Sequence, residues 1–213
     1  MYENNPLKRM ADNNFAPSAI FKTGEKLVRY CEKKRSANYT GIHDFTVYTG
    51  ILSPTFQSKY KHLNVLAKYL AYCIHNKRPE REKSVSQVGK ETFPFEPHET
   101  DLIKHALDSK YMGWGKDQHP IVQRHLHLHD PLTIATEVPV WDDKTAGFID
   151  VLRIHSNGSI EIADFKPNAK KDKKAAAQVK GYKDVLVKTL GVDPKRVFCT
   201  WFDHEHAFIL KDL

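Results

Sequence analysis

The sequence predicts an α/β protein with a central mixed β-sheet, helices that flank the sheet, and a mainly helical N-terminal region. Apolar residues recur at helical spacing through residues 63–74. Apolar runs rich in β-branched residues predict strands at 132–140, 147–155 and 159–166, and two more at 196–202 and 206–211. We predict a helix over 173–190 between the two groups, so the second half of the chain has the order β-β-β-α-β-β.

The length and the composition of the chain are those of one folded domain. With 213 residues, of which 40% are hydrophobic and 11% aromatic, the chain can bury a full core. Residues 1–17 are rich in Asn and lack periodicity, so we expect a flexible tail followed by a single domain at 18–213. That domain divides into a mainly helical part at 18–110 and a β-rich core at 120–213. No apolar run approaches the length of a membrane span, and we expect no membrane association.

The N-terminal part is predicted to contain three helices. Ile20, Leu27, Val28 and Cys31 lie on one stripe of a helix over 20–35. A longer helix follows Pro54, and a short one covers 98–110. Residues 77–97 are polar with three prolines, and we interpret them as a loop or linker.

The cysteine content and the charge bear on location and partner. Cys31, Cys73 and Cys199 are odd in number and far apart, which offers neither a disulfide framework nor a zinc knuckle. A reducing, cytoplasmic setting is expected. The net charge of +7 favours a polyanionic partner, although a solvated surface alone can produce it. The sequence does not indicate an oligomeric state.

The hairpin at 147–166 carries polar residues where its alternation calls for apolar ones. A two-residue turn at Asn157-Gly158 would set Arg153 against Ile162, which is a poor match. A three-residue loop with a left-handed Gly158 instead pairs Arg153 with Glu161, and it also pairs Ile154 with Ile160 and Leu152 with Ile162. We therefore predict the three-residue loop.

In this register Asp150 lies across from Asp164, with Cβ atoms roughly 5 Å apart, and Lys166 points to the same face. Two buried carboxylates at this short separation repel each other, so one is protonated or a cation lies between them. Oxygen ligands favour Mg²⁺ or Mn²⁺. The alternative is that this face opens to solvent and Lys166 neutralises one carboxylate.

Two polar residues of the following helix share one face. Gln178 and Tyr182 are separated by one helical turn, so they can both face the carboxylates. The alternative is that Tyr182 lies at the edge of the core and Gln178 on the surface.

These residues, in this order, resemble the RecB-like branch of the PD-(D/E)XK nuclease superfamily. The matching motifs are G-x-x-D at 147–150, D-x-K at 164–166 and Q-x-x-x-Y at 178–182, within a stretch of about 132–202. The resemblance implies a restriction-endonuclease-like core. It implies catalytic roles for Asp150, Asp164, Lys166, Gln178 and Tyr182.

The same resemblance implies a metal site. Asp150, Asp164 and the backbone carbonyl of Phe165 are expected to hold Mg²⁺ or Mn²⁺. The family often adds a His from an upstream helix, and His105 is our candidate by position, a surface histidine being the alternative. Relatives that hold an iron-sulfur cluster use four cysteines, so we expect no cluster in a chain with three.

Three further features lie near these motifs. Glu137 resembles the Glu-x-Pro strand of the family, or it is structural. His125, His127 and His129 share one face of a predicted strand, which we interpret as solvated or facing DNA rather than as a metal site. The lysines that follow the D-x-K motif are expected to contact phosphates, namely Lys170, Lys171, Lys173, Lys174 and Lys180.

The resemblance thus implies a metal-dependent deoxyribonuclease that acts in DNA replication, recombination or repair and leaves 5′-phosphate ends. The alternative is a DNA-binding accessory protein that uses the same fold without catalysis.

Overall fold

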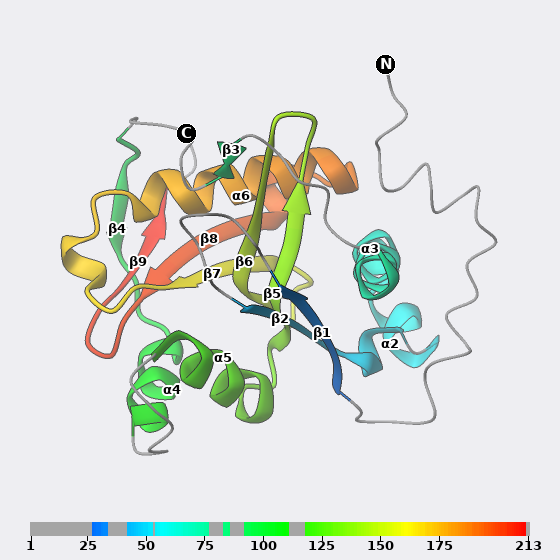
Figure 1. Ribbon diagram of the computed structural model, residues 1–213, viewed down its shortest axis with the longest axis horizontal. Helices are drawn as coiled ribbons and strands as arrows, with labels where there is room; N and C mark the ends of the chain where they lie inside the picture. Colours follow the sequence, from blue (N-terminus) through cyan, green and yellow to red (C-terminus); the bar gives the residue numbers. More distant parts are fainter. Residues whose placement is uncertain are drawn as a thin grey trace.

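The computed structural model describes residues 27–33, 42–52, 54–76, 83–85, 92–110 and 118–211. These residues form an α/β fold with one mixed sheet flanked by helices, as the sequence predicts (Figure 1). The expected tail at 1–17 lies outside the described residues. Within the described part, no helix is both long and apolar enough to cross a membrane.

The sheet joins both halves of the chain. Its order is β1-β2-β5-β6-β7-β8-β9-β4, and β3 pairs with β6. The β7–β8 and β3–β6 pairs are parallel and the others are antiparallel. The strands are β1 (Leu27–Lys33), β2 (Ile42–Tyr48), β3 (Lys83–Ser84), β4 (Phe95–Pro97), β5 (Thr133–Trp141), β6 (Thr145–Ile154), β7 (Ile160–Phe165), β8 (Val197–Phe202) and β9 (Ala207–Leu210).

Helices cover both faces of the sheet. Their bounds are α2 (Pro54–Lys59), α3 (Asn64–His75), α4 (Leu102–Ser109), α5 (Gln118–His129) and α6 (Ala175–Leu190), with 3₁₀ turns η2 (Thr49–Leu52), η3 (Lys61–Leu63), η6 (Ala169–Lys171) and η7 (Pro194–Arg196). The buried residues of α3 and α6 share one core with the sheet, and those of α4 and α5 share a second core with it. In Figure 1, α6 and the α4–α5 pair lie on opposite sides of β7, β8 and β9.

The central hairpin has the predicted register. Ile154 pairs with Ile160, Leu152 with Ile162 and Arg153 with Glu161. Gly158 has φ +80°, as the three-residue loop requires. The hairpin is not half-buried as expected, because every residue of β6 and β7 is buried between the two helical layers.

Backbone groups at both ends of α6 have hydrogen-bond partners. Asp172 accepts hydrogen bonds from the backbone N–H groups of Lys174 and Ala175 at 2.8 and 3.0 Å. At the other end Gly191 is left-handed with φ +64°, and its N–H donates to the carbonyl of Val187.

The helix predicted over 20–35 is wrong for the residues that the structure describes. Residues 27–33 form β1, which pairs with β2 along its whole length. Pairing with the next strand of the chain outweighs a weak helical pattern. Consequently the 18–110 part, expected to be mainly helical, contributes β1, β2, β3 and β4 to the sheet. The last two of these short strands fall in the expected loop at 77–97.

The strand predicted for the HLHLHD segment is also wrong, because its histidines belong to α5. Val122 and Leu126, one helical turn apart, are buried in the core under the sheet. Pro120 lies in the first turn of this helix, where a missing N–H costs nothing. The His-Leu alternation is therefore compatible with a helix whose buried apolar face is formed by Val122, which precedes the segment, and Leu126, which belongs to it.

Candidate active site

Asp150 and Asp164 lie where β6 and β7 separate. The ladder between these strands ends at the pair Val151 and Ala163. Extended by one residue, the register places Asp150 across from Asp164, as predicted. Beyond this point β6 continues beside β5 and β3, while β7 continues beside β8. The two carboxylates therefore occupy the gap that opens between two diverging strands.

Where the β6–β7 ladder has ended, the Asp150 carboxylate takes the place of a backbone acceptor for β7. Its Oδ2 accepts a hydrogen bond of 3.0 Å from the backbone N–H of Phe165. Burial raises the pKa of the Asp150 carboxyl well above its usual range, and the negative charges of Asp164 and Glu137 raise the pKa further. A proton on this buried carboxyl group, or a cation beside it, would therefore be stabilising.

Lys166 supplies one positive charge to this gap. Its Nζ lies 2.5 Å from Oδ2 of the fully buried Asp164. Burial acts to lower the pKa of Lys166, but the carboxylates of Asp164 and Asp150 outweigh burial, and the pKa is raised. Lys166 is therefore held as an ammonium.

Gln178 and Tyr182 reach the carboxylates from α6. The side-chain amide of Gln178 donates to Asp164 Oδ1 at 3.5 Å and to the Tyr182 hydroxyl at 3.0 Å. Burial raises the pKa of Tyr182 well above its usual value, and the charges of Asp164 and Asp150 add to this effect. Tyr182 therefore stays a neutral phenol, and the residues of all three motifs meet at one place.

Glu137 adds a third carboxylate from β5. Residues 136 and 138 pair with 151 and 149, so Glu137 lies opposite Asp150. Among the described non-glycine residues, only Glu137 has a positive φ, at 51°. This conformation is strained, and strained residues cluster at functional sites. Gln123 of α5 donates a hydrogen bond of 2.6 Å to Glu137 Oε1 and fixes its side chain.

The histidine beside Asp150 is His119, not the predicted His105. His119 Nε2 lies 3.6 Å from Asp150 Oδ2, and its ring packs edge-on against Phe165. His119 and Gln123 both come from the first turns of α5, and no motif in the sequence marks either one among twelve histidines and a polar helix. Only the packing of α5 on the sheet brings them to the site.

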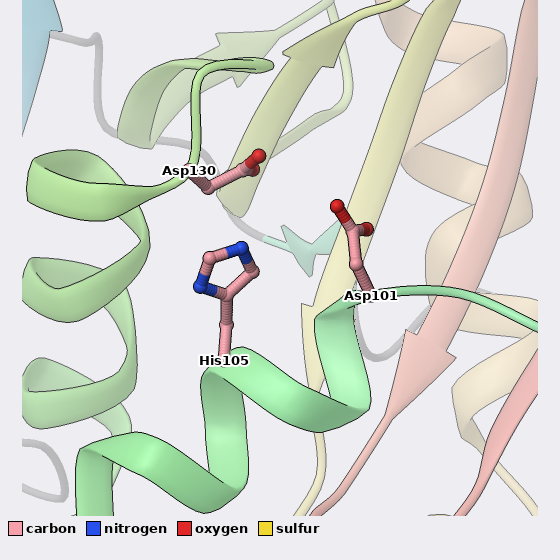
Figure 2. A group of neighbouring side chains, drawn as sticks. All are labelled: Asp101, His105 and Asp130. Carbon is pink, nitrogen blue, oxygen red and sulfur yellow. The ribbon is translucent and has the colours of Figure 1, made fainter.

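His105 belongs to a separate group with Asp101 and Asp130, which Figure 2 shows. One potential ligand atom of each lies within 4.8 Å of the others, a spacing at which they could hold a metal ion. However, the guanidinium of Arg153 already donates to Asp101 at 2.7 Å and to Asp130 at 2.8 Å. Arg153 also donates to Glu161 at 2.8 Å, so a buried ionic network surrounds this arginine.

The predicted phosphate-binding lysines follow β7. Asp172, which lies among them, raises the pKa of Lys166 through its charge, so this segment lies close to the site. Lys180 is less available, because it forms a 2.6 Å ion pair with Asp184. The other four side chains are exposed, namely Lys170, Lys171, Lys173 and Lys174.

Two cysteine side chains are described by the structure, and both lie away from the site. Cys73 and Cys199 are buried in the core shared by α3 and α6 and form no disulfide with each other. Comparison of the chain with protein-family models, curated proteins and solved structures finds no match. Function is therefore inferred from the residues of the site and from the motif resemblance.

Proposed function

We propose that the chain is a metal-dependent deoxyribonuclease of the PD-(D/E)XK type, with a restriction-endonuclease-like core. The observation that carries this proposal is the placement of Asp150 across from Asp164 where β6 and β7 diverge, with Lys166 on Asp164. Together with Glu137 the gap holds three carboxylates and one lysine ammonium. This excess of buried negative charge suits a divalent cation.

The proposed metal ligands are Asp150, Asp164, the Phe165 carbonyl and His119. The N–H of Phe165 faces Asp150, and the carbonyl of a strand residue points to the same side as its N–H. His119 takes the place that we expected for His105. This mainly oxygen donor set suits Mg²⁺ or Mn²⁺, which, when bound, neutralises charge on the phosphate and lowers the pKa of a bound water.

The chain's own residues supply the remaining steps. Lys166 is held as an ammonium, so it donates hydrogen bonds to a phosphate oxygen or to the attacking water and does not act as the base. Gln178 restrains the Asp164 carboxylate, and Tyr182 restrains Gln178. Both α6 residues therefore act by positioning.

The proposed substrate is DNA. The lysines of η6 and of the turn before α6 project from the segment that follows Lys166, where phosphates flanking the scissile bond can reach them. Such contacts are independent of sequence. We expect the affinity for DNA to fall with increasing salt. Replacement of the lysines at 170, 171, 173 and 174 should weaken DNA binding and reduce this salt dependence.

Degradation of linear DNA with Mn²⁺ or Mg²⁺, with and without a chelator, tests the proposal. Asp164→Asn should abolish cleavage while preserving the melting curve and much of the DNA affinity. Asp143→Asn, an exposed acid two residues after the end of β5, is the control and should cleave at the wild-type rate. Cleavage by Asp164→Asn at the rate of the control would remove the basis of the proposal.

The same experiment distinguishes a nuclease from a non-catalytic DNA-binding accessory protein. An accessory protein would bind DNA but cut none of the linear, circular, single-stranded or branched substrates with either metal. That outcome would favour the non-catalytic alternative.

A further inference from the structure

The histidines of the HLHLHD segment do not all share one face, because the segment is helical. On α5, His125 and His129 are one turn apart and share a face, whereas His127 lies elsewhere. Burial lowers the pKa of His127 to about 4, so this half-buried histidine is neutral. Two histidines at i and i+4 on a helix are spaced to bind one transition-metal ion.

A third imidazole, from α4, faces the first two. The ring centres of His125 and His129 are 4.7 Å apart, and those of His105 and His125 are 5.5 Å apart. Two imidazoles on one tetrahedral ion have ring centres about 5 Å apart, since each metal–nitrogen bond is about 2.0–2.1 Å long. The observed separations lie on either side of this value. Among the described residues, only Asp101, His105 and Asp130 form a group of three whose ligand atoms already lie within 4.8 Å of one another, so an ion between His105, His125 and His129 requires the imidazoles to rotate.

His105 is oriented like a metal-binding histidine whose second ring nitrogen faces a carboxylate. Figure 2 shows one ring nitrogen directed toward Asp101 and Asp130, and the other toward α5, the helix that ends just before Asp130. The Nδ1 atom is buried and has no hydrogen-bond partner among the described residues. Metal-binding histidines commonly present their second nitrogen to a carboxylate, and Asp101 and Asp130 are placed for that role.

Asp108 offers a fourth ligand from α4, one turn beyond His105. Its carboxylate acts electrostatically on both His105 and His125, so it lies near the imidazoles. The present partner of Asp108 is Lys104 at 2.7 Å, and both side chains are exposed. Such surface pairs contribute little, so Asp108 can exchange Lys104 for a metal ion at small cost.

We propose that α4 and α5 bind a zinc-type divalent transition metal through His105, Asp108, His125 and His129. The nitrogen-rich donor set distinguishes this site from the carboxylate site at Asp150, which suits Mg²⁺ or Mn²⁺. The Asp101, His105 and Asp130 group is the less suitable location, because the Arg153 guanidinium already occupies both carboxylates.

The ion would be structural. It joins α4 to α5, the helix that carries His119 to Asp150 and Gln123 to Glu137. The inference does not depend on nuclease activity.

Zn²⁺ titration by calorimetry, together with the Co²⁺ absorption spectrum, tests the site. The protein carries Asp150→Asn and Asp164→Asn, so that the carboxylate site does not compete. We expect intense Co²⁺ absorption typical of a tetrahedral site, and a rise in melting temperature with Zn²⁺. His129→Ala changes an exposed ligand and should weaken Zn²⁺ binding by more than about 10-fold.

Two further variants sharpen the test. His62→Ala removes an exposed histidine outside α4 and α5, so it is the control and should bind Zn²⁺ within a few-fold of the parent. Asp101→Asn changes a carboxylate that faces the second nitrogen of His105 and pairs with Arg153, so it should weaken Zn²⁺ binding less than His129→Ala does. Binding lost in Asp101→Asn but kept in His129→Ala would assign the ion to the Asp101 group. Absence of Zn²⁺ binding in the parent would overturn the proposal outright.

Discussion

Gly147 and Tyr182 are in direct contact across the β6–α6 interface: a Cβ atom at position 147 would lie 2.7 Å from Cε1 of Tyr182. Only a residue without a side chain lets the ring approach β6 so closely. The hydroxyl of that ring holds Gln178, which in turn reaches Asp164. The glycine of the G-x-x-D motif therefore acts on the carboxylates through Tyr182.

Gly147→Ala should destabilise the protein and displace Tyr182. The new methyl group meets the ring and also Val85 Cβ at 3.3 Å, and overpacking of this kind costs about 1–3 kcal/mol. Urea denaturation measures the loss. The penalty should shrink in a Tyr182→Ala background, where the ring is gone; an unchanged penalty would show that Tyr182 is not the obstacle.

Asp150→Asn should stabilise the metal-free protein at neutral pH. The folded-state pKa of Asp150 is raised, so its ionised form destabilises the fold above that pKa, and protonation relieves the penalty as the pH falls through it. Asparagine keeps the acceptor for the Phe165 N–H. A gain of about 1 kcal/mol corresponds to roughly 2–4 °C in melting temperature, and it should vanish in acid.

Mn²⁺ should raise the melting temperature of the wild type, because a ligand that binds only the native state stabilises it by mass action. The response should be lost in Asp150→Asn, which removes a carboxylate from the proposed ligand set. Differential scanning fluorimetry over a Mn²⁺ titration, with Asp143→Asn as the control, measures both. Equal metal responses in Asp150→Asn and Asp143→Asn would argue against coordination by Asp150.

Arg153→Met should cost about 3–5 kcal/mol at neutral pH, because it leaves buried carboxylates without their cation. Burial acts to raise the pKa of Asp130, but hydrogen bonds and charge from Arg153 bring it below its ordinary value. Stability from this pair is therefore present above the ordinary carboxyl pKa and is lost as the pH falls through the lowered one. The difference between mutant and wild type should narrow in acid.

Arg196→Met, at an exposed position in η7, is the matched control for Arg153→Met and should change the free energy of unfolding by less than about 0.5 kcal/mol. Equal effects of the two substitutions would mean that the buried network contributes no more than a surface charge.

Gly158→Ala should cost about 1–2 kcal/mol through backbone strain, since φ is +80°. The added Cβ would also clash with His62 Nε2, but that atom is the far end of an exposed side chain that can move. The cost measured in urea should therefore persist in a His62→Ala background. A cost that disappears there would assign the effect to the contact with His62.

By itself the sequence determined the central hairpin, because its information is local. Arg153 with Glu161 and Ile154 with Ile160 make chemical sense in one register only, and Gly158 supplies the left-handed residue that this register needs. The same register brought Asp150 across from Asp164. The strands β5, β8 and β9 and the helix α6 were likewise predictable from their apolar patterns.

Only the tertiary structure decided what lies next to the hairpin. The sheet includes β1 because β2 is there to pair with it, although the apolar stripe of that segment is helical. The HLHLHD segment is helical because Val122 and Leu126 pack under the sheet. That packing brought His119 to Asp150 and left His105 beside Asp101 and Asp130. The residues around each partner in such a contact have the same local pattern whether or not the other partner is present. Contacts between residues far apart in the sequence are therefore not predictable from local patterns.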